Sequence, residues 1–126
     1  MRLLLDSHAA LWWLGDDPSF GPAARRQVQD ADDVYFSAVT PWELGIKQAL
    51  GRLVMPAGLS AALSAAGFTA MAITTAHAEL APTLPAHHGD PFDRMLVAQA
   101  QLEALTLVTA DESLRPYDVP LLDARR

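Results

Sequence analysis

Short unbroken runs of apolar residues alternate along this chain with longer segments whose apolar residues recur at helical spacing. The runs predict buried strands, because strands covered on both faces lack the polar alternation of half-exposed ones. The expected strands are 3–5, 34–36, 68–73, 105–108 and 119–122. The expected helices are 8–14, 22–30, 41–50, 59–66, 75–80 and 91–104, with a short one starting near Asp111.

Strands that alternate with helices are typical of a parallel sheet with crossover connections. We therefore expect an α/β fold, with three α/β/α layers around a central, mainly parallel sheet. Pro120 interrupts the last strand and places it at an edge of that sheet. Glycines at 15, 51 and 67 mark helix ends.

Two segments carry strong helix-start signals. Thr40 can cap a helix that has Pro41 as its first residue and Glu43 three residues after the cap, which is the capping-box spacing. Asp90 and Pro91 repeat the cap and first-residue pattern before the most regular helix of the chain.

The length of 126 residues fits one domain, 1–126, and 51% hydrophobic residues can fill a single core. No segment approaches the roughly 20 apolar residues of a membrane span, so we expect no membrane association. The first apolar run ends at Asp6 and is too short for a signal peptide.

The net charge is −6 and Lys47 is the only lysine. Nucleic-acid affinity usually comes from lysine and arginine, so a metal would have to supply much of the positive charge for such a substrate. The chain has no cysteine, which excludes disulfides, thiolate nucleophiles and cysteine-ligated zinc. This composition is compatible with the cytoplasm, where we expect the protein.

Four acidic residues lie where apolar runs give way to helices: Asp6, Glu43, Asp93 and Asp111. In an open parallel sheet the carboxyl ends of the strands face one crevice, so these side chains can converge there. Clustered carboxylates repel one another unless a cation neutralises them, and Mg²⁺ and Mn²⁺ prefer oxygen ligands. The pattern predicts a metal-dependent enzyme acting on phosphate.

Each acid also has a purely structural explanation. Asp6 and Asp111 can cap helices, and Glu43 can belong to the capping box. Asp93 follows the cap Asp90 and lies in a first helical turn, where a negative charge favours the helix dipole. Spacing alone therefore indicates an acidic pocket without identifying its chemistry.

Longer motifs surround these acids and resemble those of the PIN-domain ribonucleases, specifically the VapC-type toxins of type II toxin–antitoxin pairs. They cover nearly the whole chain: Leu3-Leu4-Leu5-Asp6-Ser7-His8, Ser37-Ala38-Val39-Thr40-Pro41-Trp42-Glu43-Leu44 with Ile46-Lys47, His87-His88-Gly89-Asp90-Pro91-Phe92-Asp93-Arg94-Met95-Leu96-Val97-Ala98-Gln99-Ala100, and Leu107-Val108-Thr109-Ala110-Asp111.

The resemblance implies a catalytic quartet of Asp6, Glu43, Asp93 and Asp111 with one or two Mg²⁺ or Mn²⁺ ions. Asp93 is preferred to Asp90 because the small-apolar helix typical of the family follows it. Asp6, Asp93 and Asp111 would be the principal ligands, while Glu43 would bind through water or orient the nucleophile. The implied reaction is endonucleolytic hydrolysis of RNA, commonly transfer or ribosomal RNA, leaving 5′-phosphate and 3′-hydroxyl ends.

Several neighbours would support such a site. Ser7, Thr40, Thr109 and Asp90 can orient the carboxylates or a water through hydrogen bonds, on which metal sites depend. The candidate RNA-phosphate contacts are Lys47, Arg52 and Arg94, although each can equally be a solvated helix residue.

His87 and His88 are adjacent and do not share a helix face, so we expect loop residues that support the site or contact the substrate rather than a metal pair. Trp12 and Trp13 are also adjacent, so at least one should face outward. We expect an interface there, because VapC-type proteins form homodimers and bind an antitoxin.

Two other functions compete with the nuclease. A receiver-like phosphoacceptor domain also has an acidic metal pocket, but it needs an aspartate after the third strand and a lysine after the fifth. Ile73-Thr74-Thr75 stands at the first place and no lysine follows Lys47. The other alternative is a non-catalytic PIN-like module that only binds a partner, against which the presence of all four acids argues.

Overall fold

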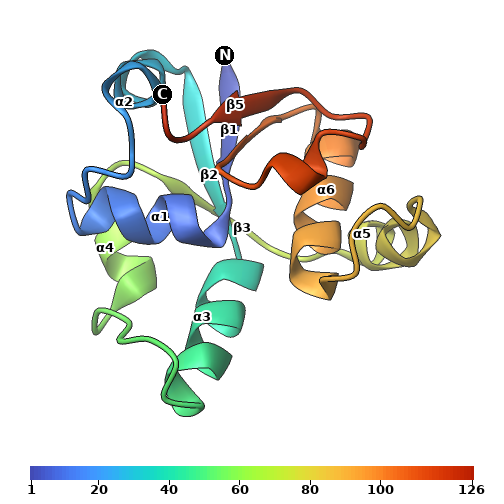
Figure 1. Ribbon diagram of the computed structural model, residues 1–126, viewed down its shortest axis with the longest axis horizontal. Coiled ribbons are helices and arrows are strands. Elements are labelled where there is room, and N and C mark those ends of the chain that lie inside the picture. The colour runs from blue at the N-terminus through green and yellow to red at the C-terminus, as the bar shows by residue number, and fades with distance from the viewer.

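The computed structural model describes all 126 residues and contains one five-stranded sheet with helices on both sides (Figure 1). All strand pairs are parallel, in the order β3-β2-β1-β4-β5. The strands are β1 (Arg2–Leu5), β2 (Asp33–Ser37), β3 (Thr69–Met71), β4 (Thr106–Thr109) and β5 (Leu121–Asp123). The expected α/β class is confirmed, and the sheet is entirely parallel.

Six α-helices and two short 3₁₀ helices connect the strands. The α-helices are α1 (Ser7–Leu14), α2 (Pro22–Asp30), α3 (Val39–Ala49), α4 (Leu59–Ala65), α5 (Thr75–Leu80) and α6 (Pro91–Glu103). The 3₁₀ helices are η1 (Ala81–Thr83) and η2 (Glu112–Leu114). None of the helices has the length and apolar character needed to cross a membrane.

The consecutive leucines of β1 explain the three layers. Leu3 and Leu5 belong to a buried cluster with residues of α1, α2 and α4, whereas Leu4 belongs to a second cluster with residues of α6. In Figure 1 these two helix groups lie on opposite sides of the sheet. Because successive side chains of a strand point to opposite faces, a strand buried on both sides needs an unbroken apolar run.

The order of the strands determines where the site can form. The chain passes from β1 to β2 and β3 in one direction, then returns across the sheet to place β4 on the other side of β1. Open α/β sheets bind ligands at such a reversal point, outside the carboxyl ends of the strands. Leu5 pairs with Val108 there, and the Asp6 amide donates to the Val108 carbonyl at 3.0 Å.

The predicted start of α3 is wrong. The helix begins at Val39, whose amide donates to the Ser37 hydroxyl at 3.0 Å, and Thr40 makes no capping bond. Pro41 is tolerated as the third helical residue because the first amides of a helix have no intrahelical acceptor. Glu43 is therefore not a capping-box residue, and its carboxylate is free to interact with other elements.

The edge strands differ in length from the prediction. β3 is confined to Thr69–Met71 because it pairs only with β2, while β5 lies at the opposite edge as Pro120 indicated. The predicted cap of α6 is confirmed, since Asp90 accepts hydrogen bonds from the Phe92 and Asp93 amides at 2.8 and 3.3 Å.

Candidate active site

Four elements bring the candidate acids to the carboxyl edge of the sheet. Asp6 directly follows β1, Asp111 follows β4, Asp93 lies in the first turn of α6 and Glu43 lies in α3. The negative charges of Asp6 and Glu43 raise the pKa of Asp93, and carboxylate oxygens of Asp93 and Asp111 lie within 4.8 Å of each other. The convergence expected from the strand-to-helix junctions is therefore present in the fold.

Asp6 combines a capping role with a buried charge. Its Oδ1 accepts from the Ala9 amide at 2.8 Å at the start of α1, and only 7% of the residue is exposed. Burial raises the pKa of Asp6, against hydrogen bonds from Thr109 and from the Ala9 amide that lower it. Glu43 raises this pKa further, which indicates that the two carboxylates are close enough to repel.

Glu43 is buried and held from two helices. Its Oε1 accepts from the Ser7 hydroxyl at 2.7 Å, and its Oε2 accepts from Lys47 Nζ at 2.9 Å. The Thr40 hydroxyl lies 3.3 Å from that of Ser7. The hydrogen bond to Glu43 raises the pKa of Lys47. Two of the expected supporting hydroxyls thus lie beside Glu43.

Asp93 has a strongly raised pKa. Burial, followed by the negative charges of Asp90, Glu43 and Asp6, raises the pKa of Asp93 to about 7, while His88 opposes the shift. The raised pKa reflects a carboxyl group that is both buried and surrounded by negative charge.

Each carboxylate oxygen of Asp111 has a hydrogen-bond partner. Its Oδ1 accepts from the amide and hydroxyl of Ser113 at 3.0 and 2.6 Å, so Asp111 caps η2 as expected. Its Oδ2 lies 3.1 Å from His88 Nε2, and that nitrogen lies 3.5 Å from Asp93 Oδ2. Burial acts to raise the pKa of Asp111, but hydrogen bonds from Ser113 and His88 leave it lowered.

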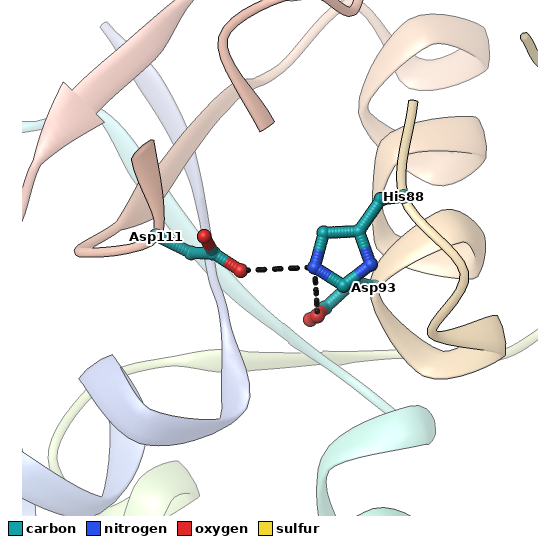
Figure 2. A group of neighbouring side chains, drawn as sticks. All are labelled: His88, Asp93 and Asp111. Atoms are coloured by element: carbon teal, nitrogen blue, oxygen red, sulfur yellow. Dashed lines mark hydrogen bonds and ion pairs between the residues drawn. The ribbon is translucent and has the colours of Figure 1, made fainter. Parts of the chain in front are cut away.

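The sequence left His88 with either a supporting or a substrate-contacting role, and its ring lies beside two acids of the site. Figure 2 shows its ring between the carboxylates of Asp93 and Asp111, and one ligand atom from each of the three residues falls within 4.8 Å of the others. The available signal was its place two residues before the α6 cap, in a loop where helical face arguments do not apply.

The three candidate basic residues lie in different surroundings. Lys47 lies against Glu43, inside the site. Arg52 is exposed, just beyond the end of α3. Arg94 Nη1 donates to the Tyr117 hydroxyl and to two backbone carbonyls, those of Pro85 and His88. Its Nη2 donates to three more carbonyls, those of Ala81, Pro82 and Leu84. Arg94 therefore anchors the loop before α6.

The donor set of the site suits a hard divalent cation. Carboxylate oxygens of Asp93 and Asp111 lie within 4.8 Å of each other, and such oxygens are the ligands of Mg²⁺ and Mn²⁺. Asp6 and Glu43 are outside this group of atoms and act on Asp93 through their charge. Burial is the largest cause of the raised pKa of Asp93, and neighbouring negative charges add to it; a bound cation would relieve that added repulsion.

Comparisons with known proteins agree with this geometry. The family model of the PIN domain matches residues 3–120. Ribonuclease VapC22 of Mycobacterium tuberculosis (strain ATCC 25618 / H37Rv) is 32% identical over 121 residues, which cover 94% of this chain and 93% of that protein.

Solved structures show the same fold at low sequence identity. VapBC2 from Rickettsia felis, bound to a DNA fragment from its promoter, has a TM-score of 0.71 at 13% identity, with 98% of both chains covered. FitAcB from Neisseria gonorrhoeae has a TM-score of 0.65 at 20% identity, with 97% of both covered. The chain belongs to the PIN-domain family, and its expected likeness to the VapC ribonucleases is confirmed.

Proposed function

We propose that this protein is a metal-dependent endoribonuclease and the toxin of a toxin–antitoxin pair. The observation that carries the proposal is the grouping of acidic side chains at the reversal point of the sheet, where burial and the charges of Asp90, Glu43 and Asp6 raise the pKa of Asp93 to about 7. The similarity to a protein named Ribonuclease VapC22 supports RNA as the substrate. We also propose a cytoplasmic location, in keeping with an RNA substrate.

The acidic side chains of the site would have different roles in hydrolysis. Asp6, Asp93 and Asp111 would hold one or two Mg²⁺ or Mn²⁺ ions, which supply Lewis-acid activation of water and neutralise charge on the phosphate. Glu43, fixed by Ser7 and Lys47, would orient the attacking water with its carboxylate. Water adds to phosphorus and the bond to the 3′ oxygen breaks, leaving 5′-phosphate and 3′-hydroxyl ends.

Lys47 is the basic residue best placed to meet the RNA. Its ammonium group lies 2.9 Å from Glu43, and its side chain is 29% exposed. The negative charges of Asp90 and Asp93 help to raise its pKa. A cation at this place can approach a backbone phosphate next to the scissile bond. Arg52 would contribute from outside the site, and Arg94 would act indirectly by holding the loop.

An apolar stripe on α3 supports protein partners. Trp42, Ile46 and Leu50 are spaced four residues apart and are 57%, 39% and 61% exposed, and Val54 follows at 90%. Val54 also lines a surface hollow with Trp12, which connects the stripe to the interface expected at the tryptophans. We propose that this surface serves a homodimer or an antitoxin, in keeping with neighbours described as toxin–antitoxin complexes.

The alternatives are less consistent with the fold. In a receiver-like sheet the third strand lies centrally and supplies the phosphorylated aspartate. Here β3 is an edge strand, and Ile73-Thr74 follows it. A non-catalytic PIN-like module needs no buried repulsive cluster, whereas Asp6 and Glu43 are both buried within one.

Sequencing RNA ends after expression in a host without the antitoxin tests the proposal. The wild type should produce 5′-phosphate ends at a limited set of sites, in transfer or ribosomal RNA. Asp111→Asn should not produce them, whereas Asp118→Asn, at an exposed position nearby, should behave as the wild type. Identical end profiles for all three proteins would contradict the nuclease assignment, and sequence-independent cleavage would contradict a specific toxin.

A further inference from the structure

The proton position on the His88 ring follows from one backbone contact. The Asp90 amide donates to His88 Nδ1 at 3.0 Å. A backbone amide can only donate, so Nδ1 must be the unprotonated nitrogen of the neutral ring. The ring proton is therefore on Nε2, the nitrogen that faces the two carboxylates.

This tautomer makes His88 a hydrogen-bond donor to the acidic site. Nε2–H faces Asp111 Oδ2 at 3.1 Å and Asp93 Oδ2 at 3.5 Å (Figure 2). A nitrogen that carries a proton has no lone pair for a cation, so proximity to two carboxylates does not make His88 a ligand. The carboxylate oxygens keep a further lone pair each and can still bind a cation while accepting this hydrogen bond.

The backbone of His88 is fixed as firmly as its ring. Its amide donates to the Tyr117 hydroxyl at 2.9 Å, and its carbonyl accepts from Arg94 Nη1 at 3.3 Å. Arg94 in turn donates to carbonyls across residues 81–85. The Nε2–H group is thus held at a defined place between an acid of α6 and an acid that follows β4.

We propose that His88 is a positioning residue of the metal centre, which holds the Asp93 and Asp111 carboxylates in their binding orientation through Nε2–H and is not itself a ligand. The inference rests on the proposed metal-dependent function and deepens it. Hydrogen bonds to ligating side chains orient them, and losing such a bond typically weakens metal affinity by about 10- to 100-fold.

Two substitutions separate this role from a merely structural one. His88→Asn keeps a carbonyl that can accept the Asp90 amide two residues on, as in an Asx-turn, but its side chain is too short to donate to the carboxylates. His88→Gln places an amide N–H about where Nε2–H lies. His87→Ala is the matched control, because His87 lies in the same loop and packs its ring edge-on against Tyr117.

Mn²⁺ binding measured by calorimetry on the purified proteins, without RNA, provides the test. We expect His88→Asn to weaken Mn²⁺ binding by about 10- to 100-fold, and His88→Gln and His87→Ala to bind near the wild-type affinity. Wild-type affinity in His88→Asn would overturn the inference, and so would an equal loss in His88→Gln.

Electron spin-echo spectroscopy of the Mn²⁺ complex distinguishes a positioning residue from a ligand. The wild type should show no strong ¹⁴N coupling of the kind that a coordinated imidazole produces. Such a coupling, lost in His88→Gln, would overturn the inference while leaving the metal-dependent function intact. A wild type that binds no Mn²⁺ would instead remove the proposed function, and this inference with it.

Discussion

Replacing Asp93 with asparagine should stabilise the metal-free protein at neutral pH, although it removes a residue of the active site. The pKa of Asp93 is higher in the folded protein than its ordinary value, so the protonated carboxyl group favours folding and the charged one opposes it. The resulting stabilisation is complete below the ordinary pKa of 3.8 and is lost as the pH rises through about 7. Asparagine is neutral at every pH, so the variant does not lose this stabilisation as the pH rises.

The size of the effect follows from the shift. A rise from 3.8 to about 7 is roughly 3 pH units, and at 1.36 kcal/mol for each unit it corresponds to about 4 kcal/mol. This is an upper value, because 20% of the Asp93 side chain is exposed. The difference in unfolding free energy between the variant and the wild type should therefore be near zero at pH 4 and approach about 4 kcal/mol at pH 8.

Urea unfolding followed by tryptophan fluorescence, in the presence of a chelator and at a series of pH values, measures this difference. Asp30→Asn, an exposed acid at the end of α2, is the control and should show no such pH dependence relative to the wild type. Saturating Mn²⁺ should reverse the order by stabilising the wild type more than Asp93→Asn. A difference that does not change with pH, or a less stable variant at pH 8 without metal, would refute the reasoning.

Three further predictions concern residues around the site. Lys47→Met removes a charge-assisted hydrogen-bond donor from buried Glu43 and should lower the unfolding free energy by about 1–3 kcal/mol in urea titrations. Arg52→Met is the control, and a loss in Lys47→Met no larger than in this control would contradict the prediction. Arg94→Lys should lower thermal stability by an amount equivalent to about 3 kcal/mol, because one ammonium group cannot reach all the carbonyls to which the two terminal guanidinium nitrogens donate. An unchanged melting temperature would contradict this. Leu50→Ser, at a position that is 61% exposed, should weaken self-association in analytical ultracentrifugation without loss of stability, and an unchanged dimer would exclude this surface.

The strands and layers could be predicted because their signals are local. Leu3, Leu4 and Leu5 form an unbroken apolar run, and each of them is fully buried against one helical layer or the other. Asp90 and Pro91 were equally informative, because a cap and a first helical residue are neighbours in sequence. Such features need no knowledge of the rest of the fold.

The environment of Glu43 could not be predicted in the same way. The Thr40–Glu43 spacing matches a capping box, yet the Ser37 hydroxyl takes the amide at the start of α3. The partners of Glu43 are Lys47, one turn along the helix, and Ser7, 36 residues away in α1. The capping-box spacing is a local signal, whereas the contact between Ser7 and Glu43 forms only after β1 and β2 have paired.

His88 and Arg94 illustrate the same limit within the site. A basic residue beside an acidic motif suggests a phosphate contact, but the partners of Arg94 are loop carbonyls that the sequence does not reveal. His88 reaches Asp111, 23 residues further on, only because β4 delivers that acid to the loop before α6. Residue types indicated the chemistry, whereas the pairing depends on the folded chain.

Cleavage of purified RNA by the wild type and by Asp6→Asn, each with Mg²⁺ or Mn²⁺ and with a chelator, tests the central claim most directly. Asparagine is as good a helix cap as aspartate, so the variant should keep the start of α1 while losing a negative oxygen ligand. Metal-dependent cleavage by the wild type, abolished by chelator and by Asp6→Asn, is the predicted result. Equal cleavage by both proteins under every metal condition would contradict a carboxylate-held metal centre.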